Sequence, residues 1–175
     1  MALVPRVCGA SVSADKVNKF ELPAFAHVPG VNERPQEGFL DHVIVLADDV
    51  TLSETAHQNI CWLFGIRLFN AQFYWEAHEV WEAVWLNAPP NSLEKRYVQS
   101  VIHLTNAALK QKMARPGAVK RLAILALDCI SDIDHHQSAI IMGLAFKDIE
   151  DAANLLLEPR TPLSKPLRLL PKYEI

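Results

Sequence analysis

The positions of the prolines leave this chain one long stretch in which helices can form. Four of the eleven prolines lie between residues 5 and 35 and four between residues 159 and 171, whereas only Pro89, Pro90 and Pro116 fall between these groups. A proline inside a helix removes a hydrogen bond and clashes with the preceding turn. We therefore predict an irregular N-terminal arm packed on the body (1–50), a helical body (51–158) and a proline-rich basic C-terminal tail (159–175).

Capping and breaking residues divide this body into about five helices. Thr51-Leu-Ser-Glu54 and Asn91-Ser-Leu-Glu94 have the spacing of capping boxes, and Pro89-Pro90 would end the helix between them. After a first helix through the apolar residues 60–69, we predict helices over 72–87, 92–113, 116–130 and 148–157. For residues 43–47 and 138–146 the sequence is compatible with either a helix or an extended segment. Short connections favour antiparallel neighbours, so the expected fold is all-α, a compact bundle.

Composition narrows the classes of protein that this chain can represent. The three cysteines, Cys8, Cys61 and Cys129, lack the spacing of a zinc site or disulfide framework, which fits a reducing compartment. A net charge of −3 disfavours a nucleic-acid partner. The apolar run at the start is too short for a signal peptide, and no stretch has the roughly 20 apolar residues of a membrane span. We predict a cytoplasmic protein that binds neither nucleic acid nor membrane.

The helix expected over 72–87 carries the most informative pair, His78 and Glu82. Helical periodicity places the two residues one turn apart, inside an arc of aromatic side chains that includes Tyr74, Trp81 and Trp85. The plainly polar face collects Gln72, Glu76, Glu79 and Asn87. A carboxylate among aromatic rings must be paired or protonated, so His78 is its expected partner. Such pairs are enriched at functional sites, and structural networks also produce them; both interpretations stay open.

The helix expected over 92–113 offers a second polar stripe of Gln99, His103, Asn106 and Lys110. A solvated face is the ordinary interpretation of such a stripe. If its inner edge turns toward the neighbouring helix, Gln99 and His103 are the groups expected to meet His78 and Glu82. Arg34, in the N-terminal arm, has a side chain long enough to fold over Glu82 or Glu79. His135 and His136 occupy a polar turn and are expected to be solvated.

The known metal and cofactor motifs are absent. The segment His78-Glu-x-x-Glu82 lacks the second histidine of the zincin motif, and no repeated Glu-x-x-His pairs of a di-iron bundle occur. The chain has no P-loop, dinucleotide fingerprint or nucleophile elbow. We therefore predict no metal and no cofactor.

Residues 69–85, FNAQFYWEAHEVWEAVW, resemble the signature of the bacterial and archaeal domain-of-unknown-function family 309. The family's His-x-x-x-Glu-x-x-Trp motif corresponds to His78, Glu82 and Trp85. Residues 97–104 (YVQSVIHL), Gly117-Ala118 and Arg121-Leu122 also fit, and the likeness covers about residues 60–157. Gln72 replaces a glycine that is usual in the family, and His103 replaces a common glutamine. The resemblance implies an all-α fold and no particular activity.

Two hypotheses for the function follow from these residues. In the first, His78, Glu82 and Glu79 perform acid–base chemistry on a small planar ligand, which is bound by Trp81, Trp85, Tyr74, Gln99 and His103. A metal variant of this hypothesis would use His78 and Glu82, with His103, as ligands. In the second, the helical face is a partner-binding or oligomerisation surface, and His78 with Glu82 is a structural pair that sets its register. We also expect a homo-oligomer, because four tryptophans suit an interface as well as a core.

Overall fold

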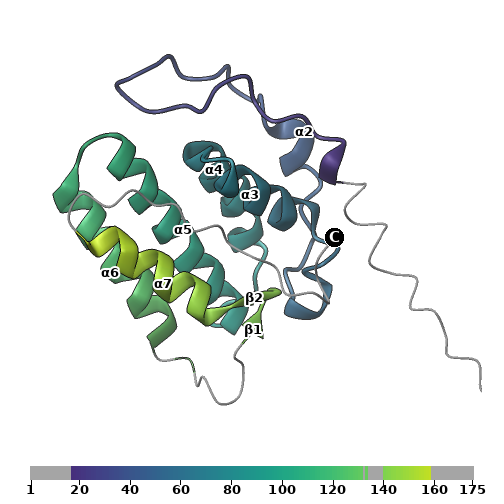
Figure 1. Ribbon diagram of the computed structural model, residues 1–175. Helices are drawn as coiled ribbons and strands as arrows, with labels where there is room; N and C mark the ends of the chain where they lie inside the picture. Colours follow the sequence, from purple (N-terminus) through teal and green to yellow (C-terminus); the bar gives the residue numbers. More distant parts are fainter. Residues whose placement is uncertain (1–16, 132, 134–139, 159–175) are drawn as a thin grey trace, which may run out of the picture.

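The computed structural model describes residues 17–131, 133 and 140–158, and most of these residues are helical (Figure 1). Its five longer helices are α3 (Ile60–Asn70), α4 (Tyr74–Leu86), α5 (Leu93–Lys112), α6 (Pro116–Ser131) and α7 (Phe146–Leu157). The shorter elements are α2 (Asp41–Ile44), a 3-10 turn η1 (Ser53–Thr55), and a hairpin of β1 (Ile140–Ile141) and β2 (Leu144–Ala145). The predicted all-α fold is confirmed.

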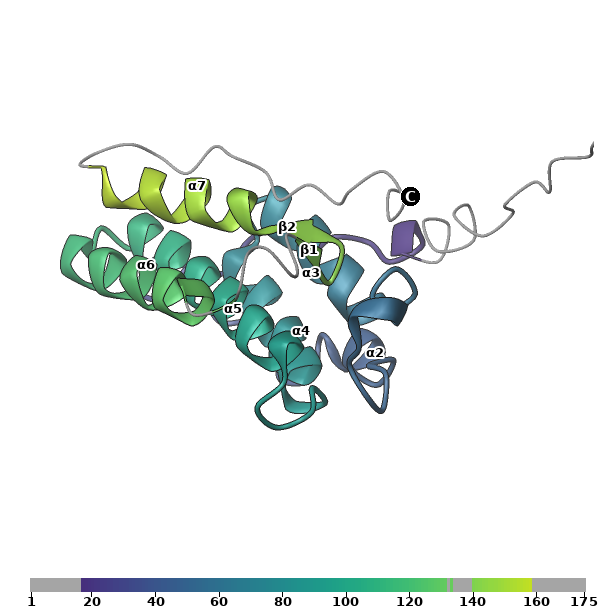
Figure 2. The same ribbon diagram turned by 90° about the horizontal axis from the view of Figure 1, so that it is seen from below.

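Helix α5 occupies the middle of the bundle. It packs against α4 on one side and α6 on the other, and α7 lies across α5 and α6 (Figures 1 and 2). The residues of α5 that face these neighbours, among them Tyr97, Val101 and Leu104, are completely buried. The core also takes in Val17, Leu40 and Val43, which precede the five longer helices. None of the described helices has the length and apolar character needed to cross a membrane.

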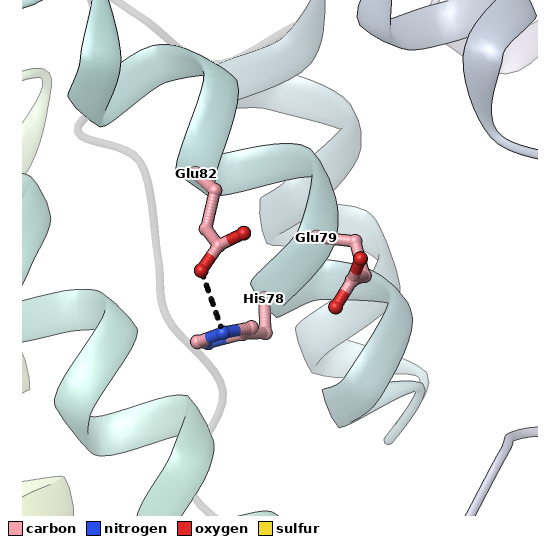
Figure 3. Close-up of side chains that lie close together, drawn as sticks. All are labelled: His78, Glu79 and Glu82. Atoms are coloured by element: carbon pink, nitrogen blue, oxygen red, sulfur yellow. Dashed lines mark ion pairs between the residues drawn. The ribbon is translucent and has the colours of Figure 1, made fainter. Parts of the chain in front are cut away.

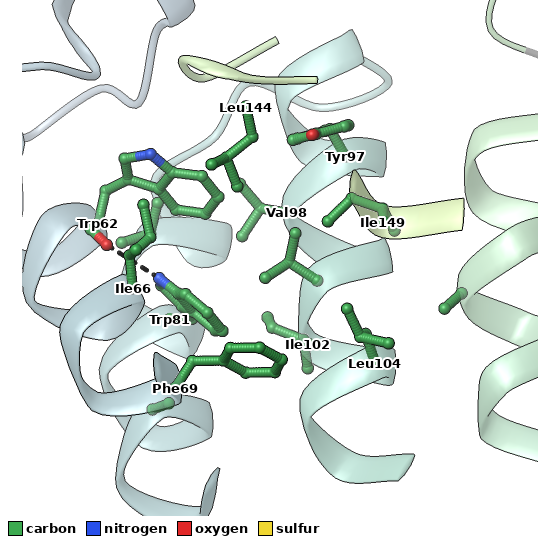
Figure 4. Packing of buried hydrophobic residues seen from close by; sticks show 14 of the residues in the cluster. Trp62, Ile66, Phe69, Trp81, Tyr97, Val98, Ile102, Leu104, Leu144 and Ile149 are labelled. Atoms are coloured by element: carbon green, nitrogen blue, oxygen red, sulfur yellow. Dashed lines mark hydrogen bonds between the residues drawn. The ribbon is translucent and has the colours of Figure 1, made fainter. Parts of the chain in front are cut away.

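Tryptophans join α3 to α4 and to the hairpin. The indole Nε1 of Trp81 donates to the carbonyl of Trp62 at 3.2 Å (Figure 4). The indole of Trp62 donates to the carbonyl of Met142 at 2.8 Å. Gly65 makes the first contact feasible, because a Cβ atom at this position would overlap the Trp81 indole. The close approach of α3 and α4 therefore fixes how α4 is rotated about its axis.

Two helix starts differ from the predicted capping boxes. Helix α3 begins at residue 60, where the side chain of Asn59 accepts the Trp62 N–H at 2.9 Å. The hydroxyl of Thr51 instead donates to the carbonyl of Val84, which ties residue 51 to α4. Helix α5 is capped by Ser92 and not by Asn91. The caps are therefore Asn59 and Ser92, in place of the predicted Thr51 and Asn91.

The turn from α3 into α4 is a Schellman motif. The N–H of Phe73 donates to the carbonyl of Leu68 and the N–H of Gln72 donates to the carbonyl of Phe69, each at 2.9 Å. Gln72 holds the left-handed position of this turn, with φ of 65°. The turn brings the chain directly into α4 at Tyr74 and so sets the direction of the helix that carries His78.

Candidate functional site

His78 and Glu82 form a pair on one side of α4. The Nε2 atom of His78 lies 3.1 Å from Oε1 of Glu82, as the i,i+4 spacing predicts (Figure 3). The His78 side chain is 18% exposed, whereas that of Glu82 is 53% exposed. The expectation that both residues avoid solvent is therefore wrong for Glu82. A helical wheel gives the direction of a side chain but not what covers its tip, and a glutamate at the edge of the arc is long enough to reach water.

The second ring nitrogen of His78 has a different environment. Its Nδ1 atom is buried and has no hydrogen-bond partner among the described residues. A neutral imidazole carries one proton, and the nitrogen that faces a carboxylate is the one that donates. In the neutral tautomer with the proton on Nε2, this nitrogen donates to Glu82 and Nδ1 is an acceptor. The contact with Glu82 also orients the ring.

Glu79 is the half-buried neighbour of this pair. Burial raises the pKa of its carboxyl group, and the nearby Glu82 carboxylate raises it further, while His78, Arg34 and His27 act in the opposite direction. One ligand atom from each of His78, Glu79 and Glu82 lies within 4.8 Å of the others. One imidazole and two carboxylates make a donor set that a divalent cation accepts, although His103 of the predicted metal variant is not part of it.

His103 approaches the pair from α5. Burial lowers the pKa of its half-buried imidazole, and the charges of His78 and Arg121 lower it further, so His103 and His78 lie within electrostatic reach of each other. Because α4 and α5 are antiparallel neighbours, a step forward along α4 matches a step backward along α5. Trp85 of α4 accordingly lines the same hollow as Arg96 and Gln99 of α5. The side of α5 that carries His103 thus faces the side of α4 that carries His78.

A hollow of about 420 Å³ lies where the end of α4 meets the start of α5. It is lined by Trp85, Pro90, Asn91, Lys95, Arg96 and Gln99. The Nζ atom of Lys95 lies 4.3 Å from the centroid of the Trp85 ring and donates to the Trp85 carbonyl at 2.8 Å. Further bonds join it to the carbonyls of Leu86 and Ala88. His78 and Glu82 are not lining residues, and the hollow begins one turn beyond Glu82.

The remaining aromatic residues predicted to bind a ligand lie elsewhere. Trp81 is completely buried and Tyr74 nearly so, and both pack against Phe69 in the core. Burial raises the pKa of Tyr74 to about 12, so its hydroxyl is not acidic. Of the predicted binding residues, the structure therefore brings Trp85 and Gln99 to the hollow and His103 to the pair, and it leaves Trp81 and Tyr74 in the core.

Sequence reasoning missed the role of Glu76. It was assigned to the polar face, yet it is completely buried, because residues of the N-terminal arm cover it. Its Oε1 accepts the backbone N–H of His27 at 2.7 Å. Burial raises the pKa of Glu76, an effect that this hydrogen bond partly offsets. A glutamate on a predicted polar face carries no signal, in the sequence, that a distant segment will cover it.

The same arm covers Trp75 and approaches Glu79. Phe39 stacks on Trp75 with ring centroids 6.1 Å apart, and the guanidinium of Arg34 lies 5.7 Å from the Trp75 ring. The charge of Arg34 also lowers the pKa of Glu79. Of the two carboxylates that Arg34 was expected to approach, the structure thus favours Glu79. His135 and His136 lie outside the described residues.

The comparisons with known proteins agree with the resemblance in the sequence. Residues 62–122 match the model of the family described as "Domain of unknown function (DUF309)". This segment contains the pair, Trp85, and both Gln99 and His103. No curated protein matches the chain.

Proposed function

We propose that this chain, whose residues 62–122 match the DUF309 family model, binds a small planar molecule between α4 and α5 and uses His78 as a general base. The observation that carries the proposal is the difference between the surroundings of the two ring nitrogens of His78. Nε2 lies 3.1 Å from the Glu82 carboxylate, and Nδ1 has no partner among the described residues. A histidine held by a carboxylate through one nitrogen can accept a proton at the other.

Each carboxylate near the imidazole has a separate task in this proposal. Glu82 holds the ring orientation and stabilises the imidazolium that forms when Nδ1 takes a proton. Glu79, whose pKa is raised by burial and by Glu82, exchanges a proton at a higher pH than an ordinary glutamate. His103, whose pKa is lowered, stays neutral and adds no positive charge that would oppose protonation of His78. Together these residues support proton transfer at Nδ1 of His78.

The hollow beside Trp85 supplies the binding surface. Its indole ring offers a flat apolar wall, and Gln99 adds a hydrogen-bonding amide on the facing helix. Trp85 follows Glu82 by three residues, a rise of about 4.5 Å along the helix. A planar group seated on Trp85 therefore extends toward Glu82 and His78 and does not need to enter the core.

A partner-binding module is the alternative from another class. Large apolar side chains are exposed around the connection between α4 and α5, notably Leu86 at 66%, Leu93 at 44% and Val50 at 50%. Such residues suit an interface with a second copy of the chain. The Glu82 carboxylate is 53% exposed, and an exposed ion pair contributes little to stability, which favours the ligand site over a purely structural role for the pair.

The test uses hydrolysis of p-nitrophenyl acetate, a planar ester that reports a reactive imidazole by release of p-nitrophenolate. We expect His78→Gln to remove most of the rate of the folded protein, and Glu82→Gln to lower it several-fold because the ring orientation is lost. His57→Gln serves as the matched control, since His57 lies away from the site beside Gln58. The free energy of unfolding of Glu82→Gln should change by less than about 1 kcal/mol, as for other exposed pairs.

Two results would contradict the proposal. One is an ester hydrolysis rate in His78→Gln equal to that of His57→Gln. The other is a loss of several kcal/mol in both His78→Gln and Glu82→Gln, the behaviour of a buried structural network. A concentration-dependent dimer that dissociates when Leu86 and Leu93 are replaced by serine, with no esterase effect at His78, would support the partner-binding alternative instead.

A further inference from the structure

Charged residues of the two signs occupy different parts of this chain. Residues 95–127 contain seven lysines and arginines and no acidic residue, whereas residues 35–66 contain five acidic residues and no lysine or arginine. A surface that only has to be soluble carries both signs interspersed. A region of one sign instead produces a field that attracts an oppositely charged partner and repels one of the same sign. The distribution therefore indicates two surfaces that prefer different partners.

The fold places most of the cationic residues around the turn between α5 and α6. We call this surface the basic end, and its cations are Lys110, Lys112, Arg115, Lys120 and Arg121. All of them except the half-buried Lys110 are exposed, and none forms an ion pair with another described residue. The charges of Arg115, Lys120 and Arg121 are thus available to an anionic partner.

The acidic residues lie beside exposed apolar side chains. Six of the ten large hydrophobic residues that are exposed in the described part of the chain lie on residues 45–52 and on the two sides of the connection between α4 and α5: Val45, Leu46, Val50, Leu52, Leu86 and Leu93. The two segments are neighbours, because the Thr51 N–H donates to the Asn87 carbonyl at 3.0 Å and the Asn87 side chain donates to the Asp48 carbonyl at 2.8 Å. We call this surface, with the exposed Asp49 and Glu54, the acidic end. Apolar side chains gathered in this way mark an interaction surface.

The two ends lie on opposite sides of the molecule. Figures 1 and 2 show the turn between α5 and α6 at one extreme of the bundle and residues 45–54, beside α2, toward the other. The two surfaces of one chain therefore do not meet. Two acidic ends, or two basic ends, repel when they face each other, so a symmetric contact through one surface is disfavoured. Opposite charges are paired when the basic end of one copy meets the acidic end of another.

We infer that copies of this chain associate head to tail, with the basic end of one copy on the acidic end of the next. Lysine and arginine also suit the apolar part of the acidic end, because their aliphatic stems cover apolar side chains while their charges reach Asp49 and Glu54. A contact between two different surfaces leaves one surface of each kind free on every pair, so it continues into a ring or a filament. The inference goes beyond the proposed function, since neither end contains His78 or Glu82.

Sedimentation velocity of the full chain over a range of concentrations measures this association. We expect assemblies that grow beyond a dimer at low ionic strength and dissociate at high salt, where exposed charges are screened. Lys120→Glu and Asp49→Lys should each weaken self-association at least about tenfold, because each brings like charges together. An equimolar mixture of the two variants should associate again, because it restores contacts between opposite charges. Asp128→Lys, exposed on α6 and outside both ends, is the control matched to Asp49→Lys.

Three results would overturn the inference. The first is a protein that stops at a dimer or stays monomeric at all concentrations, as expected if the basic residues 159–175 of the same chain cover the acidic end. The second is folded Lys120→Glu and Asp49→Lys proteins that associate as strongly as Asp128→Lys. The third is wild-type association that is insensitive to salt, and this result decides the matter if a variant does not fold. The esterase rate of His78→Gln is measured separately, so failure of the acid–base proposal remains distinguishable.

Discussion

Gln72 adopts a backbone conformation that is unfavourable for any residue with a side chain. It ends α3 in the left-handed region, with φ of 65°, where a side chain beyond glycine is crowded by its own carbonyl. The Schellman hydrogen bonds of this turn require the left-handed conformation, which glycine adopts without strain. The only described bond to Gln72 beyond the turn comes from Lys112, whose Nζ donates to its backbone carbonyl at 3.2 Å. That bond survives replacement of the side chain.

Replacing Gln72 with glycine should therefore stabilise the protein. The relief of left-handed strain exceeds the added entropy of the unfolded chain by about 0.5–1 kcal/mol. Urea unfolding followed by circular dichroism measures the change. The matched control is Ala71→Gly one residue earlier, where φ is −84° and glycine brings only the entropy cost, so that variant should lose stability. A Gln72→Gly protein no more stable than wild type would contradict this account of the turn.

Helix α4 contacts two different partners through its polar residues. Its His78 side faces α5, and its Glu76 side is covered by the segment around His27. The wheel of α4 alone suggested that Glu76 faces water, whereas the folded chain uses it as an acceptor for a backbone N–H. One carboxylate thus fastens the N-terminal arm to the helix that carries the candidate site.

Glu76→Ala should loosen this attachment. It removes the acceptor of the His27 N–H in a buried place, which costs about 1–3 kcal/mol. Hydrogen exchange of the His27 amide should become faster by a larger factor than that of amides in α6. Glu76→Gln retains a carbonyl acceptor and should lose less stability than Glu76→Ala. Equal protection of the His27 amide in Glu76→Ala and wild type would show that the arm is held by other contacts.

The stability of the whole bundle depends on pH through His103, which lies at the contact between α4 and α5. Burial, with the charges of His78 and Arg121, lowers the pKa of His103 below its ordinary value of 6.5. The unfolded chain therefore binds a proton at this residue at a higher pH than the folded chain does. The stabilising contribution is fully present above about 6.5 and is lost as the pH falls through the lower folded-state pKa.

His103→Gln should make stability less dependent on pH in the acidic range. Glutamine remains neutral, so the variant loses less free energy of unfolding than wild type between neutral pH and a pH well below 6.5. Urea unfolding at a series of pH values measures this difference. His57→Gln should follow the wild-type curve more closely. A His103→Gln curve parallel to that of wild type would show that His103 does not contribute to the acid sensitivity.

Local signals in the sequence determined the helices and the central pair. Prolines and apolar periodicity marked α3 to α7, because these effects act within a few residues. The contact of His78 with Glu82 follows from i,i+4 spacing on any helix. The family resemblance singled out the same residues together with Trp85. Each of these predictions depends on neighbours along the chain, and each needs no knowledge of the tertiary arrangement.

Only the tertiary structure decided what covers each side chain. Glu76 is buried because residues near position 27 fold over it, and Glu82 reaches solvent because nothing among the described residues closes over its tip. The hollow at Trp85 exists because the start of α5 returns beside the end of α4. A helical wheel specifies direction, whereas burial, pKa and pocket shape depend on contacts between segments that are distant in the chain.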